Sequence, residues 1–110
     1  MLDLGAVSPV ADVTLTGTLA DLADRGFTAA FAATGDGLRA AGTIQTFRAE
    51  DLTIREFHRF EGVSDPDDMS IVYAIESRDG TRGTLVDAFG VYSNPAVTRV
   101  LERVPIRLGR

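Results

Sequence analysis

The sequence predicts a single α+β domain, in which two helices pack on one face of a mostly antiparallel meander of four or five strands. Leucines and valines recur at helical spacing only near the two ends of the chain. Between them, short runs of alternating apolar and polar residues are separated by glycine-rich turns. The length of 110 residues suits one domain. We place that domain at residues 14–104, between flexible termini at 1–13 and 105–110.

The first helix is expected to start after Thr14 and to end before Gly26. Leu15, Leu19 and Leu22 recur at helical spacing, so they form one apolar stripe that can pack against a sheet. The hydroxyl of Thr14 can cap the first turn, and glycine is the residue that most often ends a helix in the left-handed conformation.

A hairpin is expected to follow this helix. The alternation over residues 27–33 predicts a strand, and the turn sequence TGDG at 34–37 predicts that the chain then reverses. The returning strand at 38–44 is rich in alanine and glycine, which makes it a weak strand. A single helical turn at 47–52 leads to the next strand.

Three strands at 54–61, 69–76 and 83–89 are expected to form the centre of the sheet. The middle one is apolar on both faces, as is typical of a strand with neighbours on both sides. Asp79 and Gly80 form one of the best short hairpin signals. A two-residue turn at these positions would place Tyr73 opposite Val86.

The second helix is expected to start at Pro95, where proline's missing N–H costs nothing, and to end at Pro105. Its apolar residues recur in the i, i+3, i+4, i+7 pattern of a buried helix face. They are Val97, Val100, Leu101 and Val104.

Composition and charge exclude several kinds of function. The chain has no cysteine, which excludes disulfides and thiolate metal sites. Its formal net charge of −5 argues against nucleic acid as a partner. No segment has the pattern of a secretory signal or of a membrane-spanning helix, so we expect a cytoplasmic protein with no membrane partner.

An acidic stretch at residues 64–68 is the first candidate site. Asp65, Asp67 and Asp68 supply three carboxylates there, and a divalent cation such as Mg²⁺ or Ca²⁺ takes such ligands. The same residues also suit a tight turn, because aspartate accepts local backbone N–H groups and proline fixes a bend. We weigh the turn above the metal site, and no other cofactor is evident.

Asp87 is the second candidate, because it lies inside an apolar strand on the same face as Leu85 and Phe89. A carboxylate in such a place must be paired or have a raised pKa. Its partner across the sheet is expected to be either Arg59 or His58. The pair would be structural, or it would belong to a polar pocket.

Several motifs resemble those of a known family. RFEG at 59–62, SDPDD at 64–68 and VYAIE at 72–76 are followed by DG at 79–80 and GTLVDAFGVY at 83–92. In this order, the motifs are similar to those of small bacterial proteins that are often labelled phosphoribosylpyrophosphate synthetase. The resemblance extends over roughly residues 14–104.

The residues themselves do not predict that synthetase activity. A site for this diphosphate needs two adjacent acids after a strand and a loop, rich in glycine and threonine, whose N–H groups hold the phosphates. Here Asp87 is a single acid, and it is followed by Ala88, Phe89 and Gly90. We therefore expect that the chain is not a true synthetase of this kind.

Two functions remain open. The first is a non-catalytic module that binds a small-molecule ligand or another protein, and that can form a homodimer through its sheet or through exposed aromatic surface. The second is an enzyme, or a metal-dependent binder, that acts on a small phosphorylated or polar metabolite. We prefer the first, because the sequence shows no nucleophile–base pair and no phosphate-binding loop. The candidate ligand-binding residues are Arg59, Glu61, Asp65, Asp67, Asp68 and Asp87.

Overall fold

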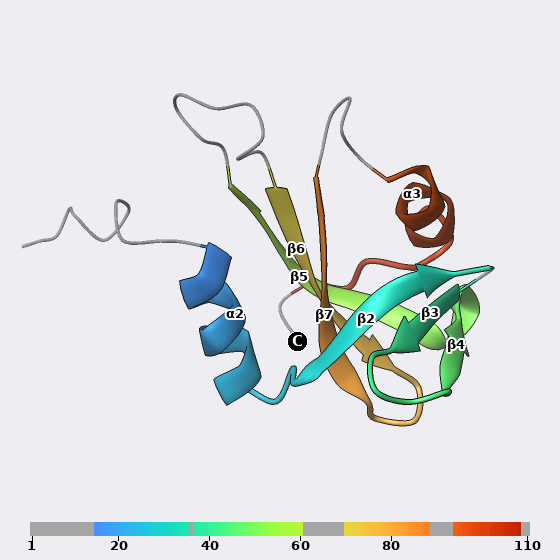
Figure 1. Ribbon diagram of the computed structural model, residues 1–110, viewed down its shortest axis with the longest axis horizontal. Helices are drawn as coiled ribbons and strands as arrows, with labels where there is room; N and C mark the ends of the chain where they lie inside the picture. Colours follow the sequence, from blue (N-terminus) through green and yellow to red (C-terminus); the bar gives the residue numbers. More distant parts are fainter. Residues whose placement is uncertain (1–14, 36, 61–69, 89–93, 109–110) are drawn as a thin grey trace, which may run out of the picture.

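The computed structural model describes residues 15–35, 37–60, 70–88 and 94–108. Within these ranges it contains two α-helices and a six-stranded sheet, which confirms the predicted α+β class (Figure 1). No helix in the described ranges is long and apolar enough to cross a lipid bilayer. The elements follow in the order α2 (Leu15–Asp24), β2 (Ala29–Thr34), β3 (Gly37–Ala40), β4 (Thr46–Arg48), the 3-10 helix η1 (Ala49–Asp51), β5 (Leu52–Phe60), β6 (Ser70–Ser77), β7 (Arg82–Ala88) and α3 (Pro95–Leu101).

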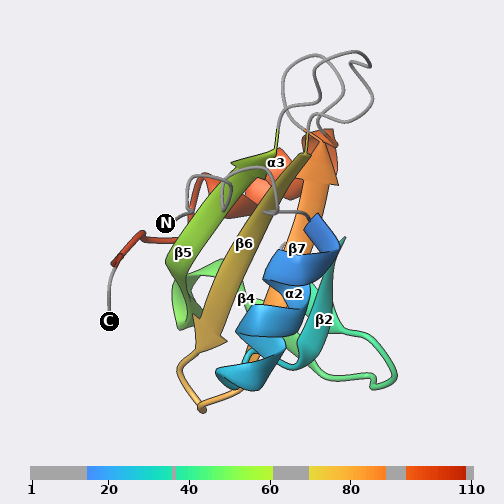
Figure 2. The same ribbon diagram turned by 90° about the vertical axis from the view of Figure 1, so that its left-hand side faces the viewer.

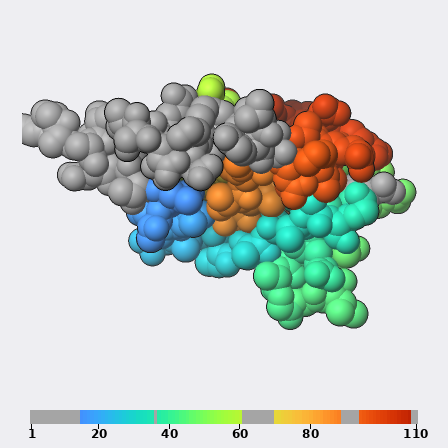
Figure 3. Space-filling view, turned by 45° about the horizontal axis from the view of Figure 1, so that its top comes forward, coloured from blue at the N-terminus to red at the C-terminus, as the bar shows by residue number. Residues whose placement is uncertain are grey.

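The sheet has the strand order β4-β3-β2-β7-β6-β5. Strands β2 and β7 are parallel, and the other neighbours are antiparallel. The sheet is mostly antiparallel, as predicted, but it has six strands where four or five were expected, and the parallel pair makes it a mixed sheet and not a simple meander. The segment at 38–44 forms only the short strand β3, and after the turn at Gly42 (φ 82°) the chain adds β4 as a sixth strand. Figure 3 shows this β3–β4 region projecting from the body of the molecule.

The two helices lie on opposite faces of the sheet, so the prediction that both cover one face is wrong. Leu22 of α2 packs with Val72 and Ala74 of β6. Val100 of α3 packs in a different cluster, together with Ile75, the next residue along β6. Successive side chains of a strand point to opposite faces. Each face of β6 is apolar, and one helix packs against each of them. Figure 2 shows α2 in front of β6 and β7, with α3 behind the sheet.

The register between β6 and β7 differs by one residue from the predicted register. Tyr73 lies opposite Leu85 rather than Val86. The Ser77 N–H donates to the Thr81 carbonyl at 2.8 Å, so the loop has three residues rather than two. Its last residue, Gly80, has φ 95°, the left-handed conformation that a three-residue hairpin requires at this point.

The segment after α3 adds to the outer edge of β5. The Ile54 N–H donates to the Pro105 carbonyl, and the Arg107 N–H donates to the Ile54 carbonyl, both at 2.9 Å. Ile54 and Ile106 thereby form a parallel bridge. Residues 105–107, which were expected to belong to a flexible terminus, are hydrogen-bonded to the sheet.

Candidate functional site

The structure describes two of the six predicted ligand-binding residues, Arg59 and Asp87. Both pair with Ile71 of β6, one from each side, so they lie on the same face of the sheet with one strand between them. The described ranges contain no group of three acidic or histidine side chains that could hold a metal ion. The remaining four candidates lie outside the described residues: Glu61, Asp65, Asp67 and Asp68. A role of the six residues in ligand binding stays a prediction.

Asp87 ties the end of β7 to the start of α3. Its carboxylate accepts hydrogen bonds from the backbone N–H groups of Ala88 at 2.8 Å and of Asn94 at 3.1 Å. Asn94 is in turn the N-cap of α3, because its side chain accepts from the N–H of Ala96 at 2.9 Å. These contacts give Asp87 a structural role, with backbone amides as partners where the sequence indicated Arg59 or His58.

A shallow groove of about 250 Å³ runs between α3 and the sheet, beside Asp87. Tyr73, Leu101 and Ile106 line it. Burial raises the pKa of the Tyr73 phenol, and the negative charge of Asp87 raises this pKa further. The phenol therefore stays protonated at neutral pH, as a hydrogen-bonding group at the wall of an apolar groove.

On the other face, an ion pair joins Arg25, the residue after α2, to β5. The Arg25 guanidinium contacts both carboxylate oxygens of Glu56, with Nη2 to Oε1 at 3.0 Å. The same carboxylate lies 3.0 Å from Nε2 of His58, the only histidine of the chain. The hydrogen bonds from Arg25 hold the pKa of Glu56 below its usual value, although partial burial opposes this shift.

This lowered pKa predicts a loss of stability in acid. A carboxylate whose pKa is lower in the folded state stabilises the fold above its unfolded-state pKa of about 4.3, and this contribution is lost as the pH falls through the folded-state pKa. Replacing Arg25 with methionine should therefore flatten the decline in unfolding free energy between about pH 5 and pH 3, measured by urea unfolding. The effect should stay below about 1 kcal/mol, because the guanidinium is 45% exposed and water screens the pair. An unchanged slope would contradict the assigned role of Arg25.

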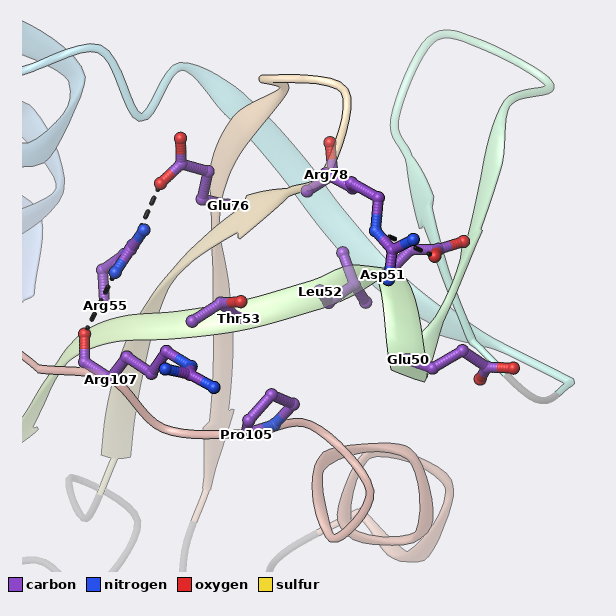
Figure 4. A pocket seen from close by; sticks show the side chains of 10 residues that line it. Glu50, Asp51, Leu52, Thr53, Arg55, Glu76, Arg78, Pro105 and Arg107 are labelled. Atoms are coloured by element: carbon purple, nitrogen blue, oxygen red, sulfur yellow. Dashed lines mark hydrogen bonds and ion pairs between the residues drawn. The ribbon is translucent and has the colours of Figure 1, made fainter.

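A polar hollow lies beside the first half of β5, and sequence reasoning missed it (Figure 4). Arg55 of β5 donates from Nε to Glu76 at 3.0 Å and from Nη1 to the backbone carbonyl of Arg107 at 3.4 Å. The hydrogen bond from Arg55 holds the pKa of Glu76 below its usual value. Arg78, in the turn after β6, has its Nε 3.6 Å from a carboxylate oxygen of Asp51. Arg55, Arg78 and Arg107 all line the hollow, and they come from three segments that are far apart in the chain. No spacing in the sequence therefore relates them.

The outer edge of β5 is a second feature that sequence reasoning did not locate. β5 is the last strand of the sheet and, with nine residues, the longest. Phe57 of this strand is 40% exposed, and its ring lies 6.5 Å from that of Tyr73, centroid to centroid. An exposed aromatic residue on a long edge strand is typical of a surface that contacts another polypeptide.

Comparisons with models of protein families, with curated proteins and with solved structures found no match. The family resemblance of the motifs between residues 59 and 92 therefore stays a prediction.

Proposed function

We propose that this chain is a non-catalytic protein-interaction module that self-associates through the outer edge of β5. One observation carries the proposal: the longest strand of the sheet lies at its edge, and among the described residues the C-terminal segment pairs only with Ile54. Long edge strands present unpaired N–H and C=O groups, and they readily pair with another chain unless they are covered.

The C-terminal segment supports this use of the edge. Its two 2.9 Å hydrogen bonds to Ile54 are a strand addition made by the chain to itself. The same edge continues beyond Ile54 over residues 56–60. A further strand can add there by the same kind of backbone pairing.

A second copy of the chain fits this stretch by symmetry. Antiparallel pairing of residues 56–60 with themselves places His58 on a two-fold axis, and it places Phe57 opposite Arg59 of the other copy. A guanidinium over an aromatic ring is attractive, and the symmetry makes this contact twice. Strands of five residues bury a small area, so we expect a weak dimer with a Kd on the order of 10–100 μM.

Sedimentation velocity between about 5 and 500 μM tests the proposal. The wild-type chain should pass from monomer to dimer over this range, and Phe57→Lys should remain monomeric because it places two cations opposite each other. Thr46→Lys is the matched control, since Thr46 is an exposed residue of β4, the other edge of the sheet. A wild-type chain that is monomeric at 500 μM would refute the proposal, and so would equal weakening by both variants.

A further inference from the structure

The polar hollow beside β5 has a volume of about 370 Å³, and three arginines line it. Arg55 comes from β5, Arg78 from the turn between β6 and β7, and Arg107 from the C-terminal segment. Figure 4 shows these side chains around Thr53, which lines the same hollow. Three segments that are far apart in the sequence therefore each contribute an arginine to the lining of the hollow.

Two of the guanidinium groups are held by carboxylates. Arg55 is fixed by Glu76, at 3.0 Å, and by a backbone carbonyl. Arg78 is paired more loosely with Asp51, at 3.6 Å. In both pairs it is the Nε side of the guanidinium that contacts the carboxylate. The two hydrogen bonds of Arg55 orient its guanidinium before a ligand arrives, which lowers the cost of binding, whereas the exposed Arg78 is held less firmly.

Arg107 is the cation that no carboxylate balances. Its guanidinium makes no hydrogen bond or ion pair within the described part of the chain, and the same holds for the hydroxyl of Thr53. The third acid at the hollow is Glu50, whose partners are Arg48 at 3.6 Å and Arg103 at 3.9 Å. Figure 4 shows Glu50 pointing away from the other labelled side chains. The lining therefore holds three acids and three arginines, and within the described part of the chain the Arg107 guanidinium and the Thr53 hydroxyl are left to donate to a ligand.

These donors match the oxygens of an anion. Guanidinium groups bind phosphate and carboxylate oxygens through parallel N–H donors, and a threonine hydroxyl can donate to the same group. A volume of about 370 Å³ falls at the lower end of the range for small-molecule sites. We infer that the hollow binds a small metabolite with several negative charges, through its phosphate or carboxylate oxygens.

Chemical shifts of the backbone amides, followed during titration with pyrophosphate and separately with citrate at constant ionic strength, test this inference. We expect saturable shifts in the segments at 53–55, 77–79 and 106–107, with a Kd on the order of 0.1–1 mM. Saturation by pyrophosphate alone would assign a phosphate ligand, and saturation by citrate alone would assign a polycarboxylate. No saturation by either anion up to 10 mM, or shifts spread evenly over the surface, would overturn the inference.

Arg107→Gln should raise the Kd for the anion at least tenfold, since it removes the cation that has no carboxylate partner. Arg99→Gln is the matched control, because Arg99 is an exposed arginine of α3 that does not line the hollow. An equal rise in Kd for both variants would mean that anion binding depends only on the net charge of the protein, and it would overturn the inference. Thr53→Val tests the hydroxyl, and it should weaken binding by a smaller factor.

Discussion

Replacing Gly83 with alanine is expected to lower the free energy of unfolding by about 3 kcal/mol. Gly83 of β7 lies opposite Ala29 of β2, at the parallel pair in the middle of the sheet. A Cβ atom at position 83 would lie 2.4 Å from the carbonyl oxygen of Ala29 and 2.7 Å from its Cβ. Backbone atoms cannot move aside as a flexible side chain can, so the two strands would have to separate. Urea unfolding followed by circular dichroism measures the loss.

A second substitution separates the contact with the Ala29 Cβ from the contact with the Ala29 carbonyl oxygen. Ala29→Gly removes the Cβ contact and leaves the carbonyl contact, so adding it to Gly83→Ala should restore only part of the lost stability. A loss below about 1 kcal/mol for Gly83→Ala alone would contradict the close parallel pairing of β2 with β7.

Leu22→Ala is expected to cost about 3 kcal/mol, because it removes the side chain that anchors α2 to the sheet. Leu22 is completely buried, in contact with the cluster that includes Val72 and Ala74 of β6. Alanine would leave a cavity between the helix and the strand. Thermal or urea unfolding of the variant measures this cost.

Leu19→Ala on the same helix is the matched control. Leu19 is only partly buried against the same cluster, so its loss should cost about half as much as the loss of Leu22. An equal or larger cost for Leu19 would mean that α2 is rotated about its axis, with a different side packed against β6.

The local patterns predicted most elements because they report local physics. The leucine stripe of α2, bounded by Thr14 and Gly26, predicted a helix that the structure places at Leu15–Asp24. The two-sided apolar pattern of β6 predicted a central strand, and β6 indeed has a neighbour on each side. These features depend on the spacing of apolar residues and on caps within a few positions of each other.

The register of the last hairpin shows where local patterns are insufficient. Asp79-Gly80 indicates a turn, but the number of residues in that turn depends on further contacts. The Asp79 side chain accepts hydrogen bonds from the Ser77 hydroxyl and from the Thr81 N–H, and these bonds lower the pKa of Asp79 to about 2. They stabilise a three-residue loop, and one residue of difference changes every pair between β6 and β7.

By itself, the sequence determined the α+β class, the two helices, the central strands and the absence of cysteine chemistry. Only the tertiary structure decided which face each helix covers, how β2 joins β7 and which arginines share the hollow. The physical reason is that periodicity within a segment reports which of its sides is apolar. It carries no information on which distant segment packs there, and Arg55, Arg78 and Arg107 meet only through such packing.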